Sequence, residues 1–369
     1  MALVGCFGVN GVVNIVCSNV KYCYTSLIRL FDYIQPMKYL FKFEARKDYV
    51  VTLLNKPIYK SNNQNRMKKF FISVMLLGSS AVAFSQLLDV ASVEKVALPT
   101  GVVVDKAIIS PQGDYLLVSD NVQGGLQTYD LATSELRTVT KANGSSYDPR
   151  ISADGKTIVY REAQVGNDRL RRISLKSVNM TTGETQTIVS PTRNLQGLAV
   201  DAAGVVAIDG GKMRRSSGAS KATPVASIDK GQLMITVNGS TKMLSPNGTT
   251  GQSYLWPSVS PDGTRVLYYL ATVGAYTCKI DGSDVKFVGK YRAARWYDNN
   301  TVVGMKDYYD ETDSVTSSKI YAVSFDGSES QLLTADDVLA MYPSVNADGS
   351  KIAFSTPAGE AYIINVNVR

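Results

Sequence analysis

The chain has 369 residues with 39 basic and 32 acidic side chains, four cysteines, 44% hydrophobic residues and no histidine. The absence of histidine excludes Ser-His-Asp and Cys-His catalysis and removes the most common ligand of zinc, iron and copper. The formal charge of +7 would indicate nucleic acid or an anionic membrane as partner only if it were spread over the folded part. However, residues 1–85 hold 11 basic and 3 acidic residues, whereas residues 86–369 hold 28 and 29. The charge therefore does not support nucleic-acid binding.

Residues 67–85 have the composition of a secretory signal peptide. Two lysines follow Met67, residues 70–77 are apolar, and the segment ends in Ala-Phe-Ser, a small-residue cleavage pattern, before Gln86. An uncleaved membrane anchor is the alternative interpretation. We expect a periplasmic or secreted protein that begins at Gln86 and is not an integral membrane protein once the signal is removed.

Residues 1–66 precede this signal, although a signal peptide belongs at the start of a protein. They mix an apolar stretch with scattered Lys, Tyr and Phe and show no sustained period. We hypothesise that Met67 is the true start and that residues 1–66 are an over-extended reading frame. The competing interpretation is a genuine membrane segment at residues 2–20, which would contain Asn10 and Asn14.

A pattern of a small or polar residue, an Asp-Gly-like turn and a β-rich run recurs along the rest of the chain. The clearest copies are ISADGKTIVY at 151–160 and VSPDGTRVLY at 259–268. Asp-Gly between alternating apolar runs predicts a hairpin, because both residues tolerate the positive φ of a tight turn. The turn positions are Gly113, Gly155, Gly204, Gly263, Asn300 and Gly349, at intervals of 42, 49, 59, 37 and 49 residues. A period of about 47 residues with two hairpins per unit predicts the blades of a β-propeller.

These intervals predict an all-β fold: a six-bladed β-propeller of four-stranded antiparallel blades over residues 86–369. The last unit ends after its third strand, and residues 92–98 resemble the missing fourth, so the N-terminal strand of the mature chain is expected to close the ring. The long third unit is explained by a polar Gly/Ser-rich loop at residues 210–231.

The repeats resemble the WD40-like propeller repeats of the TolB-like family. PSVSPDGTRV at 257–266 is similar to the first half of the family pattern, and KIYAVSFDGSESQLLT at 319–334 is similar to the second half. The resemblance covers roughly residues 92–369. It implies a propeller that docks partner proteins of the cell envelope, but it is specific for the repeat and not for function.

Aromatic and arginine residues cluster in the loops that lead into the innermost strands, where propellers bind ligands at the mouth of the central channel. The candidate partner-binding residues are Tyr147, Asp148, Arg150, Tyr254, Trp256, Arg292, Arg295 and Tyr342. Flat rings and forked guanidinium groups suit a protein or peptide, or a glycan, that carries carboxylates. Packing between blades is the alternative and the more common role of such rings.

No catalytic residue, cofactor or metal site is predicted. The acidic run at residues 307–313 lacks the glycine and the alternation of a calcium loop, so a solvated loop is expected there. The leading interpretation is an exported, monomeric, non-catalytic binding module. The alternative is a calcium-dependent propeller enzyme, either a sugar lactonase or a glycan-active hydrolase, and a third possibility is a structural subunit of an envelope complex.

Overall fold

The computed structural model describes residues 86–119, 124–201, 204–335 and 338–368, together with five strands near the N-terminus. The chain divides into two compact units, Met1–Phe84 and Ser85–Arg369. The strands of the first unit are β1 (Val4–Val9), β2 (Val12–Cys17), β3 (Tyr39–Leu40), β4 (Val50–Leu54) and β5 (Lys56–Pro57). The predicted signal peptide and the predicted start at Met67 lie outside the described residues. None of the described residues forms a helix that is long and apolar enough to span a membrane.

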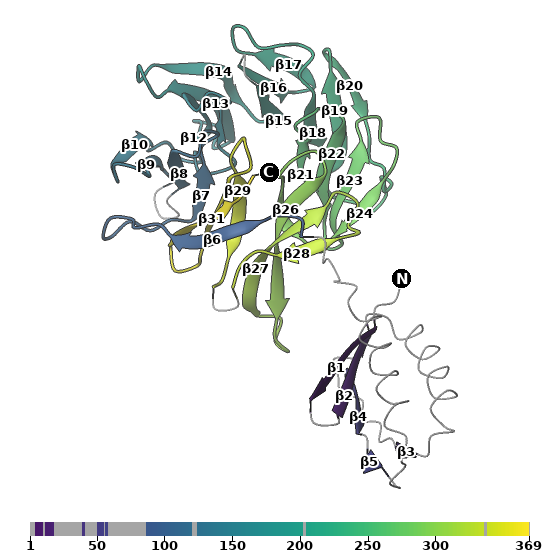
Figure 1. Ribbon diagram of the computed structural model, residues 1–369. Coiled ribbons are helices and arrows are strands. Elements are labelled where there is room, and N and C mark those ends of the chain that lie inside the picture. The colour runs from purple at the N-terminus through teal and green to yellow at the C-terminus, as the bar shows by residue number, and fades with distance from the viewer. Residues whose placement is uncertain are drawn as a thin grey trace. The chain divides into compact units, whose positions relative to one another are not determined.

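The second unit is a β-propeller with seven blades (Figure 1). Five blades have four strands, and we call these the regular blades; the third and fourth blades have three strands each. Within every blade, each strand pairs antiparallel with its neighbour.

The strands of the first three blades are β7 (Lys106–Ile109), β8 (Tyr115–Ser119), β9 (Leu126–Asp130) and β10 (Leu136–Thr140); β11 (Arg150–Ile151), β12 (Thr157–Val165), β13 (Arg171–Asn179) and β14 (Thr185–Thr192); and β15 (Leu195–Val200), β16 (Val205–Asp209) and β17 (Lys212–Arg215). Those of the fourth and fifth blades are β18 (Val225–Asp229), β19 (Gln232–Val237) and β20 (Ser240–Met243); and β21 (Tyr254–Val259), β22 (Arg265–Leu270), β23 (Gly274–Lys279) and β24 (Lys286–Gly289). Those of the last two blades are β25 (Arg292–Trp296), β26 (Thr301–Tyr309), β27 (Val315–Ser324) and β28 (Ser330–Leu332); and β29 (Met341–Val345), β30 (Lys351–Ser355), β31 (Ala361–Val366) and β6 (Val90–Lys95).

The prediction of six blades was wrong, because the long third unit contains two blades. The expected loop at residues 210–231 instead holds β17 and β18, which are the last strand of blade three and the first strand of blade four. The 59-residue interval between Gly204 and Gly263 therefore spans six strands and not four.

Blade four runs in the opposite direction to the regular blades. A blade with three strands ends at the rim opposite to its start, so the next blade must begin at that opposite rim. Accordingly, Tyr254 at the start of β21 donates its backbone N–H to the carbonyl of Gly231, which lies just after the end of β18. Pro224, just before β18, lies beside Gly263 in the turn that follows β21. Two successive three-stranded blades restore the direction, and blade five is regular again.

The N-terminal strand of the second unit closes the ring, as predicted. β6 pairs antiparallel with β31 in the register Tyr362↔Lys95 to Val366↔Val90, and so becomes the fourth strand of blade seven. The side chain of Gln331 in blade six holds the backbone of Leu88 through two hydrogen bonds of 2.9 and 2.8 Å. The closing segment is thus tied to two blades.

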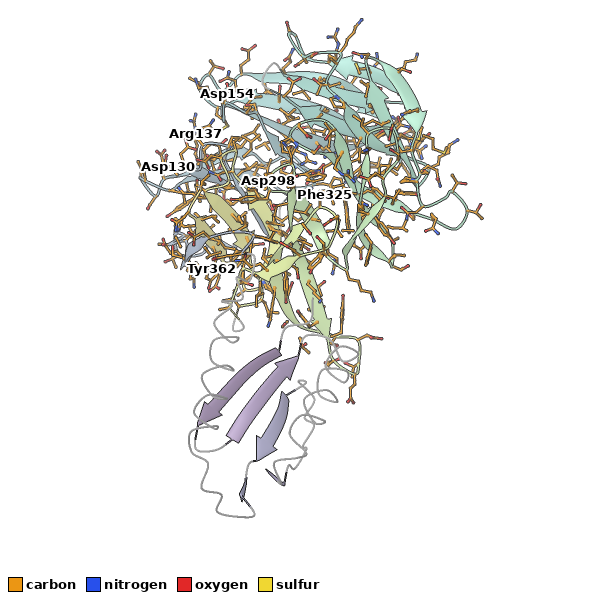
Figure 2. The ribbon with its side chains drawn as sticks, turned by 45° about the vertical axis from the view of Figure 1, so that its right-hand side comes forward. Asp130, Arg137, Asp154, Asp298, Phe325 and Tyr362 are labelled. Carbon is orange, nitrogen blue, oxygen red and sulfur yellow. The ribbon has the colours of Figure 1, made fainter. Side chains whose placement is uncertain are left out.

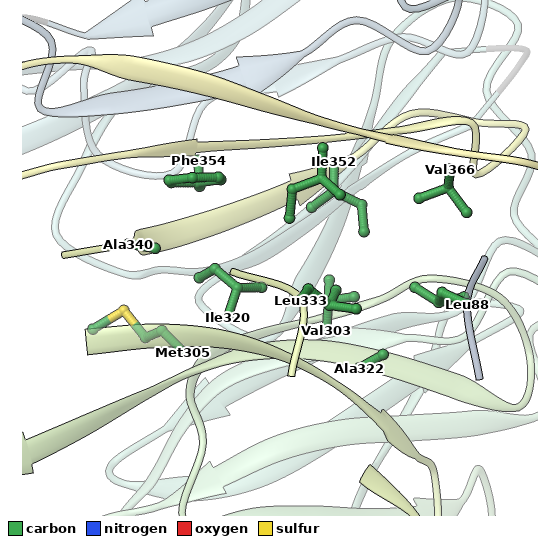
Figure 3. Close-up of a cluster of buried hydrophobic side chains, with 11 residues drawn as sticks. Leu88, Val303, Met305, Ile320, Ala322, Leu333, Ala340, Ile352, Phe354 and Val366 are labelled. Carbon is green, nitrogen blue, oxygen red and sulfur yellow. The ribbon is translucent and has the colours of Figure 1, made fainter. Parts of the chain in front are cut away.

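The core consists of apolar layers between neighbouring blades. Among the described residues there is one buried cluster for each of the seven neighbouring pairs. Strands that are covered on both faces read as continuous apolar runs, as in Arg-Val-Leu-Tyr-Tyr-Leu of β22. Figure 3 shows the largest cluster, in which Phe354 and Ile352 of blade seven face Ile320 and Val303 of blade six, with Leu88 beside them.

Candidate functional site

The innermost strands of the regular blades begin at one rim of the ring, which we call the channel mouth. In four of these blades, the residue at one equivalent position has a left-handed backbone: Asp148 (φ 50°), Trp256 (φ 50°), Ala293 (φ 48°) and Tyr342 (φ 56°). Non-glycine residues adopt this conformation rarely, at a cost of about 1–2 kcal/mol each. In β21, β25 and β29 it coincides with a shift in strand register. A bulge of this kind changes the direction of nearby side chains, and bulges are frequent beside binding sites.

One carboxylate at the channel mouth is surrounded by three guanidinium groups. Asp148 Oδ1 lies 2.9 Å from Arg150 Nη2 and 3.8 Å from Arg295 Nη2, and Asp148 Oδ2 lies 3.5 Å from Arg161 Nη1. We call these four residues the Asp148 cluster. Asp148 belongs to blade two and Arg295 to blade six, so their contact joins blades that are not neighbours in the ring. The cluster therefore extends across the mouth of the channel.

Arg161 also holds the loop in place. Its Nη1 donates hydrogen bonds of 3.0 Å to the backbone carbonyls of Tyr147 and Asp148, and its guanidinium lies 5.2 Å from the centre of the Tyr147 ring. The ring of Tyr147 is 60% exposed and faces solvent on its other side. The strained turn at Asp148 is thus fixed by one arginine that is largely, but not fully, buried.

The electrostatics of the Asp148 cluster favour a bound anion. Burial opposes ionisation of Asp148, but Arg150, Arg295 and Arg161 outweigh it and hold the pKa of this carboxyl below its ordinary value. Burial, together with the like charge of Arg150, lowers the pKa of Arg295 to about 10. At neutral pH the cluster carries three positive charges and one negative charge. Because the Arg295 side chain keeps 36% of its surface exposed, a carboxylate can reach the surplus charge.

Blades five and six contribute a second group of side chains to the channel mouth, separate from the Asp148 cluster. Arg292 Nη1 donates a hydrogen bond of 2.5 Å to Asp307 Oδ2, and this carboxylate is only 4% exposed. Burial acts against the charge of Arg292, but the bond to Asp307 raises the pKa of Arg292 above its ordinary value. The rings of Trp256 and Tyr269 meet at 5.3 Å, and Trp256 remains 46% exposed. The charges of Arg292 and Asp307 balance each other, and the exposed indole of Trp256 offers a flat apolar surface.

The predicted residues divide between the channel mouth and the core. Asp148, Arg150 and Arg295 meet in one cluster; Tyr147, Trp256 and Arg292 lie at the same mouth. The ring of Tyr342 is half-buried, with Lys106 Nζ of blade one 5.0 Å above it. Tyr254 does not fit the binding prediction, because it is fully buried between blades four and five. Its hydroxyl donates to the carbonyl of Gly248 and accepts from the N–H of Asn247, so packing explains this residue.

Sequence reasoning missed Arg161 and Asp307. The predicted hairpin contained the signal for Arg161. A turn at Gly155 pairs Arg150 with Val159. The same register, continued by two residues, places Asp148 opposite Arg161. The prediction of a solvated loop at residues 307–313 does not hold for Asp307. In fact the run begins inside β26: Asp307 is buried, whereas Asp310 lies in the exposed turn and accepts the backbone N–H groups of Thr312 and Ser314.

Within the described ranges, no group of three or more acidic or cysteine side chains converges on a point that could hold a metal ion. The one cysteine of the propeller, Cys278, is buried, and this burial raises the pKa of its thiol to about 12. No nucleophile is therefore activated there.

No family model matches the chain. No curated protein matches it either. Solved structures with a similar fold include an oligogalacturonate lyase from Vibrio parahaemolyticus, with 15% identity, a TM-score of 0.42, and coverage of 71% of this chain and 77% of that one. An oligogalacturonate lyase in complex with manganese has 17% identity and a TM-score of 0.41, covering 71% and 76%. A chain of the mitotic checkpoint complex has 9% identity and a TM-score of 0.48, covering 75% and 94%. Because all three identities are below 20% and all three TM-scores are below 0.5, these similarities carry no argument. The assignment of a propeller rests on the seven blades of the structure itself.

Proposed function

We propose that this chain is an exported, monomeric, non-catalytic β-propeller that binds a carboxylate-bearing protein or peptide at the channel mouth. The observation that carries the proposal is the Asp148 cluster, in which three guanidinium groups share one carboxylate. The unbalanced charge attracts a second carboxylate, and the planar guanidinium groups can hold it through paired hydrogen bonds. The exposed rings of Tyr147 and Trp256 add apolar contact area beside the charge.

The placement of these groups supports binding without chemistry. The three arginines of the cluster come from the strands β11, β12 and β25 of a closed ring, and Arg161 holds the loop of Asp148, so the binding geometry is formed before the partner arrives. The similarity of the repeats to the TolB-like pattern supports docking of envelope proteins, and the signal-like segment at residues 67–85 supports export.

The test uses fluorescein-labelled hexaglutamate as the probe, with hexalysine and an acidic oligosaccharide of equal charge as comparison ligands. We expect hexaglutamate to bind, and Arg295→Met or Arg150→Met to weaken its affinity at least tenfold, about 1.4 kcal/mol. Arg137→Met is the matched control, because Arg137 (labelled in Figure 2) lies on β10, which is the outermost strand of blade one, whereas the Asp148 cluster lies at the innermost strands.

Equal affinity of hexaglutamate for all four proteins would overturn the location of the binding site. Tighter binding of the oligosaccharide would replace a peptide by a glycan as the ligand class. Stoichiometric calcium in the purified protein would instead favour the calcium-dependent enzyme and overturn the non-catalytic assignment.

A further inference from the structure

The outer edge of blade three offers a second surface that the channel mouth does not use. Five blades are completed by a fourth strand, and in blade seven that strand comes from the distant segment β6. In blade three the sheet stops at β17, and no described strand pairs with its outer edge. An open strand edge presents backbone N–H and C=O groups that can accept another strand.

The burial of β17 differs from that of third strands in regular blades. The third strands β9, β23 and β31 bury most of their residues, and β13 and β27 bury four residues each. β17 buries none, and three of its four residues are exposed. The chemistry differs accordingly, because β17 reads Lys-Met-Arg-Arg. The edge of blade three is therefore both unpaired and basic.

The surroundings of β17 add to this charge. From Gly210 to Ile228 the sequence holds four basic residues and no acidic residue, in a propeller that is nearly neutral as a whole. Arg214 lies 3.7 Å from Asp209 and is half exposed, so its charge is only partly balanced. Within the described part of the chain, Lys212 and Arg215 have no carboxylate within ion-pair distance. Arg215 instead donates a hydrogen bond to the carbonyl of Ala219, which holds the end of the strand.

A hollow of about 550 Å³ adjoins the start of the same strand. It is bordered by the turn at Gly210 and Gly211, which leads into β17, by Arg193 and Lys230 from the neighbouring loops, and by Asp229. Gly211 donates its backbone N–H to Gln196 Oε1, so the turn is fixed over the hollow. A depression that is large enough for side chains thus lies next to the N-terminal end of β17.

We propose that an extended acidic segment of a partner protein docks along β17 as the fourth strand of blade three. Main-chain hydrogen bonds to the strand edge would supply affinity, and acidic side chains opposite Lys212, Arg214 and Arg215 would supply selectivity. The same charges act against the other possible occupant, a second copy of this chain. Symmetric pairing of two β17 strands sets basic side chains against each other, which is unfavourable.

Blade four is the internal comparison. Its last strand β20 is also an unpaired, exposed edge, but it reads Ser-Thr-Lys-Met and carries one charge. If backbone availability alone decided docking, β17, β20 and the outermost strands of the regular blades would all bind equally. The proposal requires the charge as well, and therefore assigns the acidic strand to β17.

The experiment measures binding of a labelled (Glu-Val)5 peptide by fluorescence anisotropy, with hydrogen exchange of the propeller read in parallel. We expect binding, slower amide exchange in β17 but not in β20, and at least tenfold weaker binding by the Lys212→Glu/Arg214→Glu variant. Lys242→Glu on β20 is the matched control and should bind as the unaltered protein does. (Lys-Val)5, and (Glu-Val)5 with N-methyl groups on alternate residues, should both fail to bind.

Each other result overturns the proposal. Absence of (Glu-Val)5 binding, equal binding of the N-methylated peptide, or protection of β20 excludes strand addition at β17. A dimer in sedimentation that the Lys212→Glu/Arg214→Glu variant abolishes would assign the edge to a second copy. An acidic peptide can also reach the Asp148 cluster, so every anisotropy comparison is made in the Arg295→Met background. Exchange protection at β17 should be the same with and without Arg295→Met.

Discussion

Two regular blades, two and five, turn their first hairpin differently from the three-stranded blade four. In blade two, Ser152 Oγ donates to Asp154 Oδ1 at 2.6 Å and accepts the N–H of Thr157 at 2.9 Å, and the N–H of Gly155 donates to the Ser152 carbonyl. Blade five repeats these bonds around Ser260. Four residues thus form a self-contained turn, which is why the pattern recurs so clearly in the sequence.

Blade four has no such turn. Its first hairpin closes with two residues, Lys230 (φ 49°) and Gly231 (φ 79°), between paired Asp229 and Gln232. This hairpin lies at the opposite rim, because blade four runs the other way. The difference teaches that the serine-aspartate turn marks one rim of the ring rather than every blade. Counting such turns therefore finds only the blades that run in the regular direction.

The largest loss of stability is expected when blade seven is reduced to three strands, the number that blades three and four have. Removal of residues 86–95 deletes β6, exposes the outer edge of the apolar strand β31 and empties the site of Leu88. Loss of Leu88 burial alone should cost about 2–5 kcal/mol of unfolding free energy. The change is measured by urea unfolding, against a chain that starts at Gln86.

A synthetic peptide of residues 86–98, added to the truncated protein, is expected to recover part of this loss. Unchanged stability without β6 would mean that the edge of β31 behaves like the polar edges of β17 and β20, and that closure by β6 is dispensable.

A smaller loss of stability tests whether residues 195–243 form two blades. A Cβ atom on Gly197 of β15 would lie 2.7 Å from Ser227 Cβ and 2.8 Å from the Ala226 carbonyl of β18. Gly197→Ala should therefore cost about 1–3 kcal/mol through overpacking between the two innermost strands. Ser240→Ala on the exposed strand β20 is the control, with a change within about 0.5 kcal/mol. If residues 210–231 formed a solvent-exposed loop, the unfolding midpoint of Gly197→Ala would not move.

The third prediction concerns the regular blades that carry the charged cluster. Asp148→Asn removes the carboxylate between three guanidinium groups and should cost about 1–3 kcal/mol at pH 7. Because the folded pKa of Asp148 is lowered, its contribution is complete above the unfolded value of about 3.9 and is lost as the pH falls through the folded value. The stability difference between the two proteins should shrink between pH 5 and pH 2. Asp168→Asn, at an exposed pair with Arg172, should change stability less at every pH.

If the difference between Asp148→Asn and the unaltered protein stayed constant down to pH 2, the guanidinium groups would not be stabilising the ionised carboxylate. The interpretation of the Asp148 cluster as a positively charged site for anions would then be wrong. The contact between Asp148 and Arg295 would also not stabilise the ring across the channel.

The strands, the serine-aspartate turns and the closure by β6 could be predicted because each depends on neighbouring residues or on the two ends of one repeat. Apolar alternation reports burial, and Asp-Gly turns report a positive φ that few residues tolerate. The residues of the channel mouth could be proposed in the same way, because equivalent positions in the repeats meet at one rim. The burial of Tyr254 could not be predicted in this way, since an aromatic residue in such a loop can turn inward as easily as outward.

Only the tertiary structure decided the number of blades and the composition of the cluster. The reversal of blade four depends on how many strands precede it, and no local pattern reports that number. The contact between Asp148 and Arg295 joins residues 147 positions apart through the closure of the whole ring. Seven blades rather than six set which innermost strands face each other across the channel, and hence which charges meet there.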